Sequence, residues 1–120
     1  MHQNWIVVGA LWGFLGVALG AFGAHGLERM TDVPEALAWW ETAALYHLLH
    51  APVLVLLGLL QRSKPGGGDK VGWCLILGSL VFSGTLYAMA LGAPRVLGAV
   101  TPLGGLLLLA GWLGLAWYGR

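Results

Sequence analysis

The chain has 120 residues, of which 58% are hydrophobic and 9% are charged, and its formal net charge is +1. Soluble proteins carry roughly a quarter of charged residues, so this composition excludes a water-soluble domain. The six basic residues lie in connections or at the chain end rather than along one face, which excludes a nucleic-acid-binding surface. The single cysteine, Cys74, lies in an apolar run and is expected to be a small buried hydrophobe.

The first apolar run, residues 5–27, has no charged side chain and exceeds the about 7–15 apolar residues of a signal-peptide core, so we expect a retained membrane helix. Its glycines are spaced so that they share one helical stripe: Gly9, Gly13, Gly16, Gly20 and Gly23. Small residues let membrane helices approach closely. We therefore expect this helix at the centre of the bundle, with Trp12, Phe14 and Leu19 more peripheral.

A second helix is predicted to begin in the connection that follows. Asp32 and Glu35 have capping-box spacing, and Pro34 is tolerated in a first helical turn. The helix is expected to start near Val33 and to continue through the second apolar run, residues 42–60.

Two tryptophans precede this run. Trp39 and Trp40 fall where the chain meets the lipid headgroups, the level at which aromatic rings are enriched. Both are predicted to be interface anchors.

Two further apolar runs cover residues 71–91 and 99–118. Each of the four runs reaches the length of about 20 residues that spans the hydrocarbon layer. Backbone groups in lipid must be paired internally, so helices are the only spanning solution for runs without alternating polarity. The prediction is an all-α integral membrane four-helix bundle with short loops, forming one domain over residues 1–120.

The basic residues predict the orientation in the membrane. Four lie on the side of the N-terminus and two on the other side: Arg62, Lys64, Lys70 and Arg120 against Arg29 and Arg95. Loops rich in Lys and Arg remain in the cytoplasm, so both termini are predicted to be cytoplasmic.

Polar groups within the spans form the candidate site. His47 and His50 are three residues apart beside Tyr46, and His25 ends the first run on the same side of the membrane. An ionisable group at such depth is expensive and usually has a partner. Three imidazoles are therefore expected in one half of the bundle.

Three interpretations of these histidines remain open. Neutral imidazoles at His25, His47 and His50 can bind a transition metal or haem, with Tyr46 as a neighbour. Alternatively, each histidine bonds across helices to a carbonyl or to hydroxyls such as those of Ser83, Thr85 and Tyr87. The second interpretation carries more weight, because histidines three apart without Cys or carboxylate partners are a weak metal signal. A proton relay is the third.

Other activities lack their machinery in this sequence. There is no Ser–His–Asp set, no phosphate-binding loop and no Cys-x-x-Cys motif, so a hydrolase, an NTPase or a thiol oxidoreductase has no candidate machinery. The first run also lacks the buried carboxylate of small multidrug antiporters.

Four linked motifs carry a family resemblance: GAFGAHGL at residues 20–27, Tyr46 with His50, FSGTLYAMAL at 82–91, and TPLGG with AGW at 101–112. With these motifs the chain resembles the YgdD-like, TMEM-type small membrane proteins of unknown function. The resemblance implies a four-span protein of the bacterial inner membrane with relatives in eukaryotes, and it supplies no activity.

The resemblance also selects positions. Those on the family pattern are His25, Tyr46, His50, Ser83, Gly84, Tyr87, Thr101, Pro102 and Gly104. His47 stands where relatives often have glutamine, which favours His25 with His50 as the couple. A polar intramembrane cluster of His25, Tyr46, His50, Ser83 and Tyr87 is the predicted binding site.

The leading functional hypothesis is a structural or accessory component of a membrane complex. Its expected partners are the bilayer and either another membrane protein or a second copy of the chain. A histidine-based haem or metal protein is the alternative, and a proton-linked small carrier is the third hypothesis.

Overall fold

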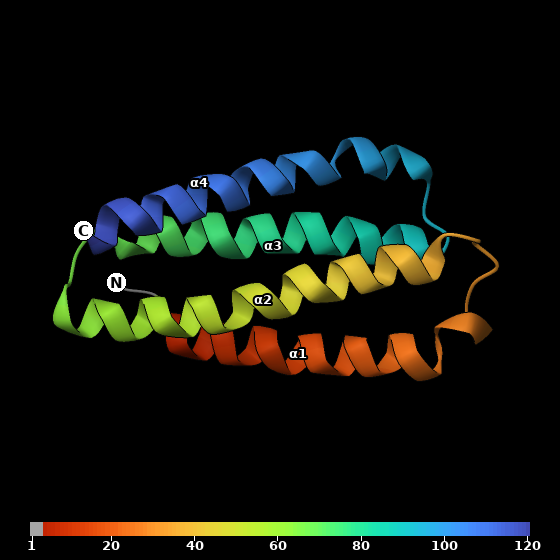
Figure 1. Ribbon diagram of the computed structural model, residues 1–120, viewed down its shortest axis with the longest axis horizontal. Coiled ribbons are helices and arrows are strands. Elements are labelled where there is room, and N and C mark those ends of the chain that lie inside the picture. The colour runs from red at the N-terminus through yellow and green to blue at the C-terminus, as the bar shows by residue number, and fades with distance from the viewer. Residues whose placement is uncertain (1–3) are drawn as a thin grey trace.

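The computed structural model describes residues 4–120. It contains four long helices: α1 (Trp5–His25), α2 (Ala36–Ser63), α3 (Gly68–Ala90) and α4 (Thr101–Gly119) (Figure 1). Two short 3₁₀ turns, η1 (Leu27–Arg29) and η2 (Arg95–Ala99), precede α2 and α4. All four helices are long and apolar enough to cross a membrane, which confirms the all-α four-helix fold.

The helices pack in chain order. α1 packs against α2, α2 against α3, and α3 against α4, so that α2 and α3 form the middle and α1 and α4 the edges (Figure 1). The prediction that the first helix lies at the centre is therefore wrong. Its glycines form a single stripe, which allows close packing against one neighbouring helix. The remaining faces of the helix carry large apolar side chains.

The glycine stripe of α1 is the contact with α2. Gly9, Gly16 and Gly23 are buried, and a Cβ atom at Gly9 would come within 2.8 Å of the Val55 backbone nitrogen. Gly13 meets the Cβ of Ala51, whereas the space beside Gly20 is open to at least 4 Å. Four of these five glycines therefore lie at the contact with α2, and Gly20 lies off it.

Trp12 corrects a second expectation. Its indole Nε1 donates to Ser79 Oγ at 2.9 Å, and its ring stacks on the His47 imidazole at a centroid distance of 3.8 Å. Trp12 shares a helical face with Gly9 and Gly16, so it points inward. Leu19 also packs against the core, and only Phe14, 74% exposed, is peripheral as expected.

Two apolar clusters fill the interior. One, at the η1 end, contains Leu27, Trp40 and Met89. The other, toward the opposite end, contains Trp5, Leu57 and Leu108, among others. The polar residues of α2 lie along the same helix between these two groups, so the candidate site is enclosed by apolar packing above and below.

Trp40 is a core residue and not an interface anchor. It is only 3% exposed, and its Nε1 donates to the Leu19 carbonyl at 2.7 Å. Its ring fills the space that Gly23 leaves, since a Cβ there would lie 2.3 Å from the ring. The anchor prediction is therefore wrong for Trp40 because the glycine stripe draws its ring inward.

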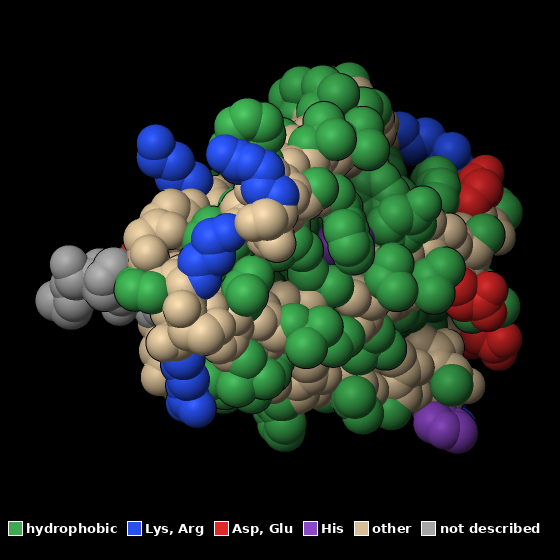
Figure 2. Space-filling model, turned by 60° about the vertical axis from the view of Figure 1, so that its left-hand side comes forward, with side chains coloured by type: hydrophobic (Ala, Val, Ile, Leu, Met, Phe, Trp, Pro, Cys, Tyr) green, Lys and Arg blue, Asp and Glu red, His purple; other side chains and the backbone are tan. Residues whose placement is uncertain are grey.

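The charged side chains separate to the two ends (Figure 2). The α2–α3 connection and the end of α4 carry most of the basic residues, and the opposite end carries most of the acidic ones. The sets are Arg62, Lys64, Lys70 and Arg120 at one end, and Glu28, Asp32, Glu35 and Glu41 at the other, where Arg29 and Arg95 also lie.

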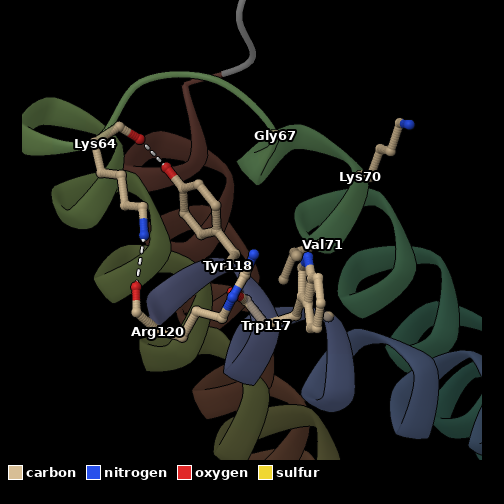
Figure 3. Close-up of a pocket in the computed structure, with 8 residues that line it drawn as sticks. Lys64, Gly67, Lys70, Val71, Trp117, Tyr118 and Arg120 are labelled. Atoms are coloured by element: carbon tan, nitrogen blue, oxygen red, sulfur yellow. Dashed lines mark hydrogen bonds between the residues drawn. The ribbon is translucent and has the colours of Figure 1, made fainter.

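The basic end is closed by contacts between α4 and the α2–α3 connection (Figure 3). The Tyr118 hydroxyl donates to the Lys64 carbonyl. The Lys64 ammonium donates to the backbone oxygen of Arg120 at 2.9 Å. These bonds fix the end of α4 against the loop before α3.

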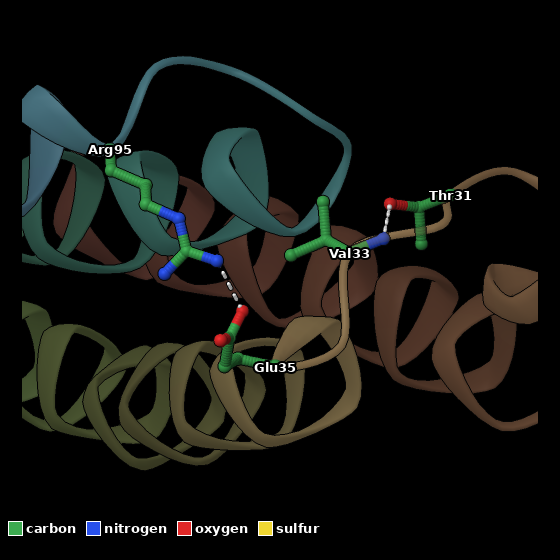
Figure 4. Close-up of polar contacts among 4 residues, drawn as sticks. All are labelled: Thr31, Val33, Glu35 and Arg95. Atoms are coloured by element: carbon green, nitrogen blue, oxygen red, sulfur yellow. Dashed lines mark hydrogen bonds and ion pairs between the residues drawn. The ribbon is translucent and has the colours of Figure 1, made fainter.

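At the acidic end, the predicted capping box does not form. The Thr31 hydroxyl accepts from the Val33 N–H at 3.2 Å, and Glu35 pairs with Arg95 at 2.7 Å (Figure 4). α2 then begins at Ala36, close to the predicted start. The carboxylate that was expected to cap the helix instead ties α2 to the turn before α4.

Candidate binding site beside two buried histidines

His47 is fully buried and bonded at both ring nitrogens. Its Nε2 lies 2.8 Å from the Trp12 carbonyl, and its Nδ1 lies 2.9 Å from the Tyr87 hydroxyl. A carbonyl only accepts, so Nε2 carries the proton and Nδ1 accepts from Tyr87. Through these two bonds the imidazole joins α1, α2 and α3.

Serine side chains extend this polar centre. Ser79 accepts the indole N–H of Trp12, and the Ser83 hydroxyl donates to the Ala43 carbonyl at 2.7 Å. Each bond crosses between helices, although neither involves a histidine; the interhelical bonds expected of the histidines include those of His47 to Trp12 and Tyr87. The predicted polar cluster in the bundle interior is confirmed for His47 and Tyr87.

His50 has the opposite tautomer. The Trp112 indole N–H, which only donates, lies 3.0 Å from Nε2. Nε2 is therefore the acceptor, and Nδ1 carries the proton and donates to the Tyr46 carbonyl at 2.6 Å. His50 is 2% exposed, whereas Trp112 is 42% exposed and forms part of the outer surface.

A groove lies outside the His50–Trp112 pair, between α2 and α4. Its volume is about 560 Å³, and Tyr46, Leu106 and Phe82 are among the residues that line it. The Tyr46 ring packs on Phe82 of α3 at 4.6 Å, and its hydroxyl has no hydrogen-bond partner among the described residues. This volume and a largely apolar lining with few polar groups are typical of ligand sites.

The groove continues toward the acidic end. A neighbouring cavity of about 590 Å³ shares Phe82 and Pro102 with it and reaches Arg95. Together the two cavities follow α4 from the η2 turn to Trp112. The result is a long concave surface between α2 and α4.

The structure does not bring His25 and His50 together. His25 ends α1 on an exposed turn, whereas His50 lies 14 residues into α2, roughly 21 Å along its axis. The connection between the helices sets this offset, which the sequence does not specify. The five predicted residues therefore do not form one cluster. Tyr87 bonds to His47, which lay outside the prediction, Ser83 bonds to the Ala43 carbonyl, and His50 bonds to the Tyr46 carbonyl.

A haem or metal site finds no support among the described residues. No group of three His, Cys, Asp or Glu side chains converges there. The acceptor nitrogens of His47 and His50 are engaged by Tyr87 and Trp112, so neither offers a lone pair to an ion in this arrangement.

Sequence reasoning missed Trp12, Ser79 and Trp112. Trp12 was detectable, because it lies three residues after Gly9 and four before Gly16 on the packing stripe. Trp112 carried no such signal, since its partner His50 belongs to a helix two positions away in the packing order.

Outside the spans, one ion pair perturbs a titratable group. The Arg95 guanidinium hydrogen-bonds the Glu35 carboxylate and lowers the pKa of that carboxyl. Arg95 also lies over the Trp39 ring, 5.1 Å from its centroid. The anchor role of Trp39 stays a prediction.

Comparison with known proteins places the chain in a family. Residues 19–105 match the family described as "Protein of unknown function (DUF423)". A UPF0382 membrane protein of Staphylococcus haemolyticus is 44% identical, over 90% of this chain and 88% of that protein. One of Haemophilus influenzae is 40% identical, over 98% of this chain and 94% of that protein. One from Schizosaccharomyces pombe is 40% identical, covering 88% of this chain and 92% of that protein.

No solved structure matches the chain significantly. The expected resemblance to an uncharacterised multi-pass membrane family is confirmed, whereas the narrower YgdD-like label is not. With most of its length matched by the family and by these relatives, the chain belongs to the DUF423 family of membrane proteins of unknown function.

Proposed function

We propose that this chain is an accessory membrane protein without catalysis of its own, and that it holds a transmembrane helix of a partner protein in the α2–α4 groove. The observation that carries the proposal is Tyr46, which lines this groove and whose hydroxyl has no hydrogen-bond partner among the described residues. A hydroxyl at membrane depth is stabilised by a hydrogen-bond partner, since the hydrocarbon offers none. A backbone carbonyl or polar side chain of a docked helix supplies that acceptor.

The shape of the groove favours a helix. Its wall includes Gly105 of α4, where an added Cβ would meet only a Phe82 ring carbon at 3.8 Å. Small residues on an open face let a second helix approach closely, which is the main source of helix association in lipid. The groove follows α4 for about ten residues, or roughly 15 Å, so it can contact half of a spanning helix.

The histidines support a binding role over a chemical one. Both ring nitrogens of His47 and of His50 are bonded within the chain, and no buried side-chain nitrogen or oxygen of the described residues lacks a partner. His50 therefore forms part of the wall of the groove, and His47 holds the helices together behind it. Tyr46 is the polar group that remains available to an occupant.

We further propose that the protein lies in the bacterial inner membrane with both termini in the cytoplasm. The excess of basic residues at the end that carries the α2–α3 connection supports this orientation (Figure 2). A fluorescent protein fused after Arg120 is expected to be bright, and alkaline phosphatase fused there inactive. The reverse pattern contradicts the orientation and leaves the groove proposal standing.

The groove is tested by filling it. Gly105→Leu places a large side chain in the groove where the structure has room for it. Gly20→Leu is the matched control, because Gly20 also borders open space but lies on α1. Both tagged variants are solubilised from native membranes in mild detergent, and co-purifying proteins are quantified by mass spectrometry against the parent.

A membrane protein recovered in stoichiometric amount with the parent and with Gly20→Leu, and lost from Gly105→Leu, supports the proposal. Equal recovery from both variants places the partner elsewhere and overturns it. Recovery of a second copy of the chain alone, lost from Gly105→Leu, also overturns it, because the groove then serves self-association.

A further inference from the structure

We propose that the basic end of the bundle carries a second site, which binds the phosphate of an anionic phospholipid headgroup. A cavity of about 630 Å³ opens there between α4, the start of α3 and the α2–α3 connection. None of its lining residues belongs to the α2–α4 groove. The inference therefore goes beyond the proposed function.

Three cationic side chains and no Asp or Glu side chain line this cavity. The cations are Lys64, Lys70 and Arg120. Asp69, the nearest acid in sequence, accepts hydrogen bonds from Trp5 at 2.8 Å and Gln61 at 2.9 Å on another side of α3. The field in the cavity is therefore positive and favours an anion.

The cations differ in how strongly they are engaged (Figure 3). The Lys64 ammonium donates to the Arg120 backbone oxygen, and the Arg120 guanidinium lies 3.7 Å from the Trp117 ring centroid. Lys70 stands at the rim with its ammonium pointing outward, and no hydrogen bond or ion pair joins it to another described residue. Lys70 is thus the most available donor for a phosphate.

The apolar part of the lining selects a lipid over a free ion. Val71, Gly114 and the exposed ring of Trp117 form one wall, and they lie on α3 and α4, which are long and apolar enough to cross a membrane. A phosphate held by the cations that line the cavity places the attached acyl chains along this wall. Basic pockets at the membrane surface between helices have this recognition chemistry.

The test uses the full chain in detergent, titrated with phosphatidylglycerol or phosphatidylcholine and followed by native mass spectrometry. Phosphatidylglycerol is expected to be retained, and phosphatidylcholine retained less. Lys70→Gln is expected to weaken phosphatidylglycerol binding about fivefold, the contribution of one lysine near an anionic lipid. Arg62→Gln, at the same exposed end but outside the cavity, is the matched control and should leave binding unchanged.

A second arm separates a lipid from a free phosphate. Trp117→Ala removes the apolar wall and is expected to weaken phosphatidylglycerol binding, and inorganic phosphate is expected not to displace the lipid. Equal losses in Lys70→Gln and Arg62→Gln overturn the site in favour of diffuse surface attraction. Displacement by inorganic phosphate with no effect of Trp117→Ala overturns the lipid assignment.

Discussion

The two buried histidines of α2 differ in what surrounds them. His47 lies inside the bundle, stacked under Trp12 and bonded to α1 and α3. His50, one turn later, is bonded to α4 through Trp112 and forms a wall of the groove. The first centre holds three helices together, and the second separates the interior from an open surface.

Their tautomers differ because their partners differ. His47 donates from Nε2 and accepts at Nδ1, and His50 does the reverse. A second proton on His50 would sit on Nε2, so that two N–H donors, those of His50 and Trp112, would face each other and the hydrogen bond would be lost. At His47 the Tyr87 hydroxyl can turn and accept instead. His47 and His50 are three residues apart and share a helix face, yet the neighbouring helices determine which ring nitrogen of each carries the proton.

The largest expected effect is at the inner centre. His47→Ala removes two hydrogen bonds and leaves a cavity under Trp12, so we expect the free energy of unfolding to fall by roughly 2–4 kcal/mol. Unfolding in mixed detergent micelles followed by circular dichroism measures it. His50→Ala is the comparison, and a larger loss there would reverse the assignment of the two centres.

A smaller loss is expected at the outer centre. Trp112→Phe removes the donor to His50 while keeping an aromatic wall, and should lower the free energy of unfolding by about 1 kcal/mol. It should also expose the freed Nε2, so that diethyl pyrocarbonate modifies His50 faster than in the parent. Unchanged modification of His50 would argue against the groove being open at this wall.

The two tyrosines sharpen the comparison further. Tyr87→Phe breaks a buried bond to His47 and should destabilise the protein by about 1 kcal/mol. Tyr46→Phe removes a hydroxyl with no described partner, so less than about 0.5 kcal/mol is expected. The measurement is again the free energy of unfolding of the isolated chain, and equal losses would mean that Tyr46 has an internal partner.

The smallest effect concerns the exposed pair that lies outside both centres. Arg95 lowers the pKa of Glu35 below its usual value of 4.5, so the pair favours the folded state above that pH. This contribution is lost as the pH falls through the lowered pKa. Arg95→Gln should raise the pKa of Glu35 toward 4.5, as measured by carboxyl carbon chemical shifts. In the Arg95→Gln background, His47→Ala should still lower the free energy of unfolding more than His50→Ala does.

The sequence was most informative where one physical requirement acts on one helix. The hydrocarbon thickness determines the four spans, and the need for close approach places Gly9, Gly16 and Gly23 at a contact. How far each helix is rotated about its axis depends on the helix it packs against. The sequence of one helix alone therefore did not predict that Gly20 lies off the contact or that Trp40 points into the core.

The polar partners were the least predictable part. His50 bonds to Trp112, and Glu35 to Arg95, across helices that the chain connects only indirectly. Local spacing favoured a capping box at Asp32 and Glu35, and the tertiary ion pair replaced it. Residue type indicated that His47 and His50 had partners, and only the packed helices identify them.

Packing in chain order has a consequence for biogenesis. The α1–α2 hairpin can form while the ribosome is still making α3, because its contacts lie within the segment already inserted. The α3–α4 hairpin then adds beside α2, completing the row. The Trp5 indole, in the first turn of α1, donates to Asp69 at the start of α3, so this bond can form only after the beginning of α3 has been synthesised.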